Sequence, residues 1–173
     1  MKKFILSSLA VALLLCFLVF GYIPDTNAES VNNPKGITNK SLDLWNNGNI
    51  SLLGEIYSPD YTLHLINQDN PEIVGTEALK DYVNFLRTAY PDLKFVREEV
   101  MVSGNKVISQ TSFSGTNTGP RGDLQPTGKS VNVSGVIISR IDDGKIAEEW
   151  IYINMASVYK QLGFTITPPS GKQ

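Results

Sequence analysis

Four β-rich segments occupy the second half of the chain, at residues 93–102, 106–116, 129–141 and 145–153. Val, Ile, Thr and aromatic residues recur in all four, which is typical of strands. The triplets Ser103-Gly104-Asn105 and Asp142-Asp143-Gly144 have the composition of tight hairpin turns. A longer Gly- and Pro-rich loop is expected at 117–128. This half of the chain therefore has to form an antiparallel sheet, and the rest of the chain has to cover it.

Helical patterns precede and follow this sheet. Apolar residues at helical spacing predict helices at 38–47, 50–57, 76–89 and 155–162, with a short strand at 61–66. Gly48 and Gly163 stand where the left-handed C-cap of a helix is expected. The order of elements indicates an α+β fold in which a curved antiparallel sheet packs against the N-terminal helices. We expect a lead-in at 29–37, one domain at 38–164 and a flexible tail at 165–173.

The N-terminus has the pattern of an export signal. Lys2 and Lys3 precede an uncharged, apolar run at 4–22, and Thr26-Asn27-Ala28 suits a signal peptidase that would leave Glu29 as the mature N-terminus. The alternative is an uncleaved membrane anchor, because the run approaches the length that spans a bilayer. Both interpretations place the domain outside the cytoplasm, either secreted or held at the membrane through residues 4–22.

Composition excludes several classes of function. The chain carries 15 basic and 17 acidic side chains, and this mild acidity argues against a nucleic-acid partner. His64 is the only histidine and Cys16 the only cysteine, and cleavage would remove the cysteine. A metal site built on imidazoles or thiolates is therefore not expected. The triplet Arg121-Gly122-Asp123 spells an integrin-binding motif, but such a triplet arises easily by chance in a Gly- and Pro-rich loop.

Three stretches together resemble a known family: 44–49 with 57–61 and His64, then 90–93, then 126–129 with 135–163. They read LWNNGN, YSPDY, YPDL and PTGK, followed by DGKI, EEW and QLG. This ordered set is similar to the SnoaL-like polyketide cyclases, often called ester cyclases. The resemblance covers about residues 38–164. It implies a cone-shaped α+β fold of the nuclear-transport-factor type with a deep apolar pocket, usually in a homodimer.

The resemblance also implies a chemistry. Cyclases of this family close a polyketide ring by an intramolecular aldol step, without metal or organic cofactor. Their acid/base carboxylate falls on Ile151 here, and a histidine on the neighbouring strand falls on Ile137. A histidine before the tryptophan falls on Glu149, and another falls on Asn117. His64 keeps the identity that the family has at its position.

The last hairpin decides which side chains share a face. With Asp142-Asp143-Gly144 as a three-residue loop, Ile137 would lie opposite Glu149. One face would then carry Val133, Ile137, Glu149, Ile151 and Ile153. A two-residue Asp-Gly turn would slip the register by one residue and separate them.

Glu149 is the one ionisable group on that face. Burial raises the pKa of a carboxyl group, which suits a general acid or base near neutral pH. Alternatively, Glu149 reaches the pocket rim or pairs with a cation. His64 is the expected catalytic partner, although a lone histidine on an apolar strand is more often structural. The expected ligand-binding side chains are Trp45, Tyr57, Tyr82, Phe85, Gln110, Phe113, Asn117, Ile137 and Ile151.

Three functions remain open at this point. The first is a binding domain that holds a small hydrophobic molecule in an apolar pocket. The second is a cofactor-free cyclase- or isomerase-type enzyme that uses Glu149 and His64 as acid/base groups. The third is a structural or protein-interaction dimer whose pocket is filled by side chains. We also expect a homodimer through the exposed sheet face, with Trp150, Tyr152, Val136 and Ile138 contributing.

Overall fold

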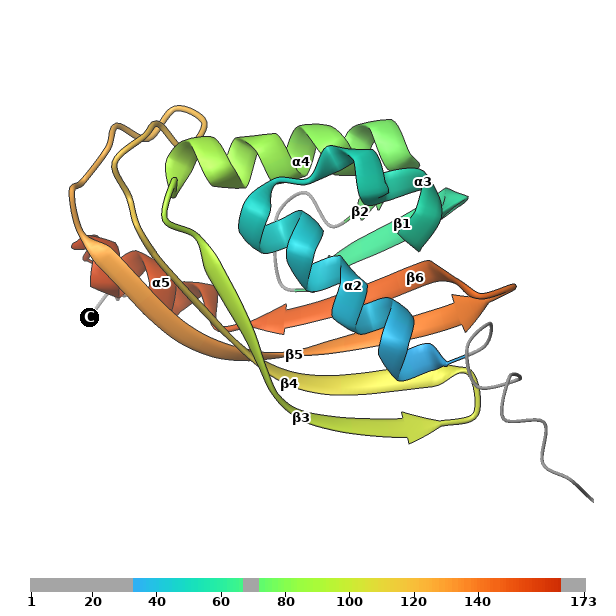
Figure 1. Ribbon diagram of the computed structural model, residues 1–173. Helices are drawn as coiled ribbons and strands as arrows, with labels where there is room; N and C mark the ends of the chain where they lie inside the picture. Colours follow the sequence, from blue (N-terminus) through green and yellow to red (C-terminus); the bar gives the residue numbers. More distant parts are fainter. Residues whose placement is uncertain (1–32, 67–71, 166–173) are drawn as a thin grey trace, which may run out of the picture. The chain divides into compact units, whose positions relative to one another are not determined.

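The sheet is built from β1 (Tyr57–Ile66), β2 (Glu72–Val74), β3 (Lys94–Ser103), β4 (Lys106–Thr116), β5 (Ser130–Asp142) and β6 (Lys145–Ile153). These six strands form one sheet in the order β2-β1-β6-β5-β4-β3 (Figure 1). The computed structural model describes residues 33–66 and 72–165 of the chain. The four strands predicted in the second half are all present. The short strand β2 was not predicted, and β1 begins four residues earlier than expected.

Strand pairing is antiparallel except at one place. The pairs β1–β2, β3–β4, β4–β5 and β5–β6 are antiparallel, whereas β1 and β6 run parallel. The sheet is therefore mixed rather than wholly antiparallel as expected. The parallel pair arises because β1 precedes the meander in the chain and joins it at the β6 edge. The α+β class is confirmed.

The β5–β6 hairpin differs from the predicted register. Asp142 pairs with Lys145, so the turn has two residues, Asp143 and Gly144, both with positive φ. A bulge then shifts the register between the Ile141 and Arg140 pairs. As a result Ile137 lies opposite Ile151, and Glu149 lies opposite Ser139. The turn and the bulge each shift the register by one residue, so Ile137, Glu149 and Ile151 still share one face.

Helices cover one face of the sheet. They are α2 (Pro34–Asn47), η1 (Ile50–Leu52), α3 (Leu53–Ile56), α4 (Thr76–Ala89) and α5 (Met155–Leu162). Helix α2 starts at Pro34 rather than at 38, because Asn33 caps it by accepting a hydrogen bond from the Gly36 amide at 3.1 Å. Residues 34–37 of the expected lead-in are therefore helical. Gly48 and Gly163 are the left-handed C-caps, as predicted.

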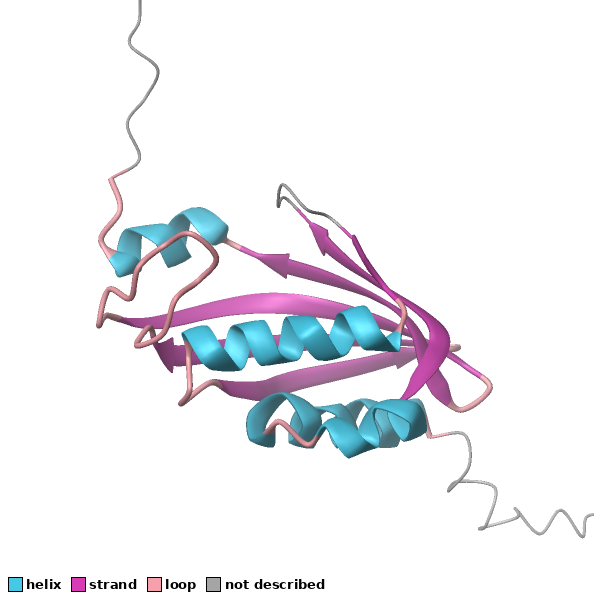
Figure 2. Ribbon diagram, turned by 90° about the horizontal axis from the view of Figure 1, so that it is seen from above, coloured by secondary structure: helices cyan, strands magenta, loops and turns pink. Residues whose placement is uncertain are grey.

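The core lies between the helices and the concave side of the sheet. Helices α2 and α4 lie over the same side of the strands, and α5 follows β6 at one end (Figures 1 and 2). Fully buried side chains there include Leu44, Ile56, Tyr57, Leu63 and Val83. We call the side that the helices cover the inner face of the sheet and the opposite side the outer face.

The predicted export segment at 1–28 lies outside the described residues, and so does the predicted tail beyond Thr165. Within 33–66 and 72–165, no helix has both the length and the apolar character needed to cross a membrane.

Candidate functional site

Two neighbouring cavities lie between the helices and the inner face. The larger, which we call the main pocket, has a volume of about 50 Å³. It is lined by Trp45, Leu65, Tyr82, Leu86, Tyr90, Phe95, Phe113, Arg121, Ile151, Ile153, Met155 and Val158. All but one of these residues are apolar or aromatic, and Arg121 is the only charged one. Its walls suit an apolar molecule, while its volume is well below the several hundred Å³ of a typical ligand site.

The smaller cavity, which we call the inner cavity, lies deeper along the sheet. It has a volume of about 20 Å³ and is lined by Ser41, Leu42, Trp45, Phe95, Arg97, Thr111, Ile137, Glu149 and Ile151. Trp45, Phe95 and Ile151 line both cavities and therefore form the wall between them. The inner cavity is lined by Ser41, Arg97, Thr111 and Glu149, whereas Arg121 is the only charged residue that lines the largely apolar main pocket.

Glu149 is buried at the inner cavity, with 3% of its surface exposed. The Tyr61 hydroxyl donates to Oε2 at 2.7 Å, and the Ser139 hydroxyl donates to Oε1 at 2.6 Å. Burial raises the pKa of the Glu149 carboxyl group, while the two hydroxyl donors and the nearby Arg97 cation offset part of that rise. The predicted burial of Glu149 is confirmed. A buried carboxyl group with a raised pKa is typical of general acids and bases.

Aromatic side chains with polar tips surround this carboxyl group. Trp45 Nε1 donates to the Tyr57 hydroxyl at 3.1 Å, and the Tyr57 and Tyr61 rings meet edge-on with centroids 4.6 Å apart. Burial, followed by the Glu149 charge, raises the pKa of both tyrosines well above the ordinary value. Both are neutral near neutral pH; the Tyr61 hydroxyl donates to Glu149, and the Tyr57 hydroxyl accepts from Trp45. Tyr57 thus contacts Trp45 and Tyr61 and does not itself line either cavity.

The predicted pairing of Glu149 with His64 is wrong. His64 neighbours Leu63 and Leu65, whose side chains are buried on the inner face, so alternation places His64 on the outer face. Its Nε2 lies 2.9 Å from Glu148 Oε1, and its Nδ1 lies 3.3 Å from Glu72 Oε1. The ring stacks on Trp150 with centroids 5.3 Å apart.

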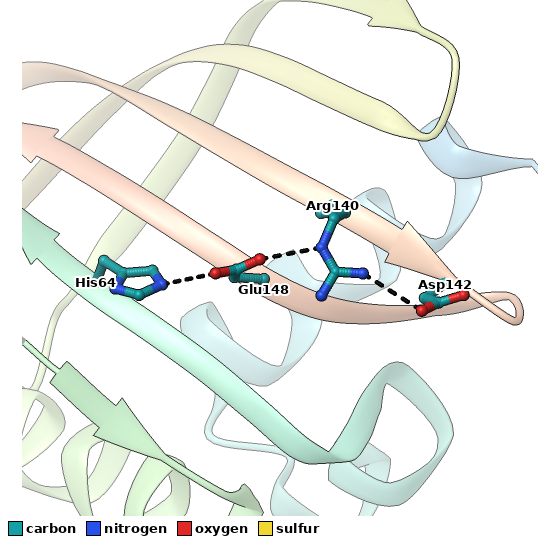
Figure 3. A network of polar contacts seen from close by, with 4 residues as sticks. All are labelled: His64, Arg140, Asp142 and Glu148. Carbon is teal, nitrogen blue, oxygen red and sulfur yellow. Dashed lines mark hydrogen bonds and ion pairs between the residues drawn. The ribbon is translucent and has the colours of Figure 1, made fainter.

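Glu148, rather than Glu149, organises the charges of the outer face. It joins His64 to Arg140, whose Nε donates to Glu148 Oε2 at 3.0 Å, and Arg140 continues to Asp142 at 3.3 Å (Figure 3). The His64 ring, and then the Arg140 guanidinium, hold the pKa of Glu148 below its ordinary value. Two adjacent glutamates thus lie on opposite faces with opposite pKa shifts.

The other predicted ligand-binding residues divide into two groups. Trp45, Tyr82, Phe113, Ile137 and Ile151 line one or both cavities. Phe85 stacks against Tyr82 beside the main pocket without lining it.

Gln110 and Asn117 do not belong to the site. Gln110 lies on the outer face, where its amide donates to Glu98 at 2.9 Å. Both polar atoms of the Asn117 side-chain amide make hydrogen bonds, within the 117–128 loop and to the end of α4. Asn117 donates to the Ala89 and Gly119 carbonyls at 3.1 and 2.8 Å and accepts from the Thr127 amide at 2.9 Å. Its role in the fold is to fasten this loop to the end of α4.

Several residues of the site were missed from the sequence: Tyr61, Tyr90, Arg97, Arg121 and Ser139. Ser139 and Arg97 lie two residues from Ile137 and Phe95 along their strands, so the two-residue period of a strand could have placed them on the same inner face. Arg121 comes from the long loop, whose position no local pattern indicates. Tyr90 follows the last residue of α4 and looks like an ordinary core aromatic.

Comparison with known proteins agrees with this architecture. A sequence model of the SnoaL-like polyketide cyclase family matches residues 37–162. Aklanonic acid methyl ester cyclase DnrD of Streptomyces peucetius is 24% identical over 136 residues, which cover 78% of this chain and 94% of DnrD. The structure of AclR from Streptomyces galilaeus, proposed to be a hydroxylase, is 26% identical with a TM-score of 0.66 and covers 81% of this chain and 87% of AclR.

A solved structure from Bacillus cereus, proposed to be a polyketide cyclase, is 26% identical with a TM-score of 0.60. It covers 73% of this chain and 78% of the Bacillus protein. The similar proteins thus carry the names of two different reactions on one fold. The fold alone does not indicate which reaction, if either, a protein catalyses, so function has to be argued from the side chains of the site.

Proposed function

Since the chain belongs to the SnoaL-like polyketide cyclase family, we propose that it is an exported domain that binds a small hydrophobic molecule in the main pocket. The observation that carries the proposal is the composition of the pocket wall. Apolar and aromatic side chains from the sheet, α4 and α5 converge there with few polar groups among them. Such a wall gains free energy by excluding water around an apolar molecule.

Buried polar groups argue against a merely structural core. Such a core satisfies its buried polar atoms or has none, because an unpaired one costs stability. Here the Tyr90 hydroxyl and Arg97 Nε, each from a residue that lines a cavity, are buried and have no hydrogen-bond partner among the described residues. They support a site that is completed by a ligand. The small cavity volume then requires half-buried side chains such as Tyr82 and Met155 to move outward when the ligand enters.

A cofactor-free enzyme is the second candidate function. Its support is Glu149, a buried carboxyl group with a raised pKa at the deep end of the site. Against the family's aldol chemistry stand Ile137 and Ile151, which occupy the positions of the family's histidine and acid/base carboxylate. His64 lies on the outer face and takes no part, so the acid/base role would fall on Glu149 with Tyr61 and Ser139 as its hydrogen-bond partners.

The two tryptophans of the chain provide a test of binding. Trp45 lines both cavities, whereas Trp150 lies on the outer face against His64. In the Trp150→Phe protein, Trp45 is the only tryptophan, and we expect decanol, a neutral apolar probe, to change the tryptophan emission in a saturable way. In the matched Trp45→Phe protein, only Trp150 remains, and we expect no change. An emission change confined to Trp150, or none in either protein, would contradict the proposed pocket.

Native mass spectrometry of protein purified from its own host complements the probe. We expect a co-purifying small molecule that is lost on denaturation. Incubation of the protein with polyketide methyl esters separates the two candidate functions. We expect no aldol cyclisation, because Ile151 cannot accept a proton. Turnover that disappears in Glu149→Gln would instead establish the enzyme and give the acid/base role to Glu149.

A homodimer through the outer face belongs to the same proposal. Tyr152 and Val136 lie there, 42% and 37% exposed, beside the half-buried Trp150 and Ile138. A continuous apolar surface on a sheet is uncommon on a monomer. Three of its charged neighbours, His64, Glu148 and Arg140, already pair with one another within the chain (Figure 3). Their charges would therefore enter an interface already paired.

A further inference from the structure

One cation lies in the wall of the otherwise apolar main pocket. Arg121 comes from the 117–128 loop and is half-buried, whereas Gly122 and Asp123 beside it are exposed. Its guanidinium lies over the Tyr159 ring at 5.5 Å and donates to the Tyr159 hydroxyl at 3.4 Å. Among the described residues, no carboxylate lies within ion-pair distance of it. The arginine of the Arg-Gly-Asp triplet is therefore directed to the pocket.

A buried hydroxyl lines the same pocket. Tyr90 is 1% exposed, its ring packs edge-on against Phe113 at 5.5 Å, and its hydroxyl has no hydrogen-bond partner among residues 33–66 and 72–165. Burial raises the pKa of Tyr90, and the Arg121 charge lowers it in part. Tyr90 and Arg121 both line the main pocket. Tyr90 is a neutral donor near neutral pH. Tyr82, whose pKa burial raises to about 12 and Arg121 lowers in part, adds a second neutral phenol near the cation.

The chain fixes Arg121 in this place. The Arg121 amide donates to the Leu124 carbonyl at 3.0 Å, and the Leu124 amide donates back at 3.1 Å, which closes a tight turn. Asn117 fastens the loop to the end of α4 through the Ala89 carbonyl. Gly119 lies so close to α4 that a Cβ at this position would be 1.9 Å from the Thr88 carbonyl oxygen. The cation is thus positioned by the fold before any ligand arrives.

We propose that Arg121 and the Tyr90 hydroxyl bind a carboxylate, so that the ligand of the main pocket is an apolar molecule that ends in a carboxylic acid. The inference rests on the proposed binding function and adds the chemical class of the ligand. A guanidinium and a phenol are complementary to a carboxylate, which accepts charge-assisted hydrogen bonds from both. The apolar wall takes the rest of the molecule. The ligand also completes the hydrogen bonding of a buried hydroxyl that is otherwise unpaired.

Decanoate and decanol, which share a chain and differ in the head group, test this proposal. In the Trp150→Phe protein, Trp45 fluorescence reports the affinity for each. We expect decanoate to bind at least about tenfold more tightly than decanol, because a hydrogen bond to a charged group changes affinity by about 10- to 100-fold. Adding Arg121→Gln should remove the preference. Lys129→Gln, an exposed residue of the same region with the same change in charge, should keep it.

Tyr90→Phe separates a ligand contact from a structural role. The Tyr90 hydroxyl makes no hydrogen bond within the described part of the chain, so its removal should leave the melting temperature unchanged or higher. The substitution should weaken the binding of decanoate by about tenfold and leave the affinity for decanol unchanged. Equal affinity for acid and alcohol, or an acid preference that survives Arg121→Gln, would overturn the carboxylate proposal and leave the binding function standing. No binding of either probe would overturn both.

Discussion

Replacing Glu149 with Gln is expected to stabilise the protein at neutral pH by about 1 to 3 kcal/mol. Removing a carboxylate from water costs several kcal/mol, and the hydroxyl donors Ser139 and Tyr61 return only part of this. Because the pKa of Glu149 is raised in the folded protein, a net penalty remains. Each unit of difference from the unfolded value of about 4.3 corresponds to about 1.4 kcal/mol. Glutamine has the shape of the protonated group and avoids the penalty.

The penalty has a defined dependence on pH. Below about pH 4.3 both the folded and the unfolded chain hold the proton, and Glu149 costs nothing. As pH rises, the unfolded chain loses the proton first, so the free energy of unfolding falls until pH passes the folded-state pKa. The melting temperatures of the two proteins should therefore grow apart as pH rises from about 4, and their difference should become constant above the folded-state pKa. Equal melting temperatures throughout would show that Glu149 is solvated and would refute the reasoning.

Glu148→Gln is the matched control, because it makes the same chemical change one residue away on the other face. The His64 ring and Arg140 lower the pKa of Glu148, so its charged form stabilises the folded state. The substitution should destabilise at neutral pH by no more than about 1 kcal/mol, since the group is partly exposed. The difference from the wild type should shrink as pH falls through the folded-state pKa. If Glu149→Gln raises and Glu148→Gln lowers the free energy of unfolding at neutral pH, the two glutamates lie in different electrostatic environments.

Three further predictions concern the loop, the outer face and the N-terminus. Asn117→Ala should lower the free energy of unfolding by about 2 to 4 kcal/mol in urea titrations, because it leaves buried backbone groups unpaired, whereas exposed Thr118→Ala should change it little. The wild type should sediment as a dimer at micromolar concentration and Val136→Glu as a monomer, with Asn84→Glu on α4 as the control; a monomeric wild type would exclude the interface. N-terminal sequencing of protein from its own host should begin at Glu29, and a full-length membrane-bound species would establish the anchor instead.

Periodicity in the sequence was sufficient for much of the fold. Alternation in β6 placed Glu149 and Ile151 on the buried face, and the structure confirms this. The hairpin register was predicted incorrectly, because nothing local distinguishes a three-residue loop from a two-residue turn followed by a bulge. The expected His64 pairing failed for a reason that the sequence does contain: Leu63 and Leu65 are the apolar positions of β1, so the residue between them faces outward.

Long-range contacts limited the prediction of the site. The parallel pairing of β1 with β6 sets Leu63 beside Glu149 and brings Tyr61 close enough to donate to its carboxyl group. Neither strand signals that pairing by itself. Arg121 likewise belongs to a loop that Asn117 fastens to the end of α4, and the Ala89 carbonyl that accepts this hydrogen bond is 28 residues away in the sequence. Composition identified these residues as polar, but only the tertiary structure assigns them partners.

The β5–β6 ladder bears on the choice between binding and catalysis in the proposed function. Ile137 and Ile151, on which the sequence resemblance would place the family's histidine and carboxylate, are direct cross-strand partners. The next pair on the same face is Ser139 with Glu149, joined at 2.6 Å. The polar pair thus lies one same-face step along the ladder from Ile137 and Ile151. Ile151 belongs to the wall between the main pocket and the inner cavity, so a molecule in the main pocket meets isoleucine before it can reach Glu149. This order of contacts favours binding over proton transfer.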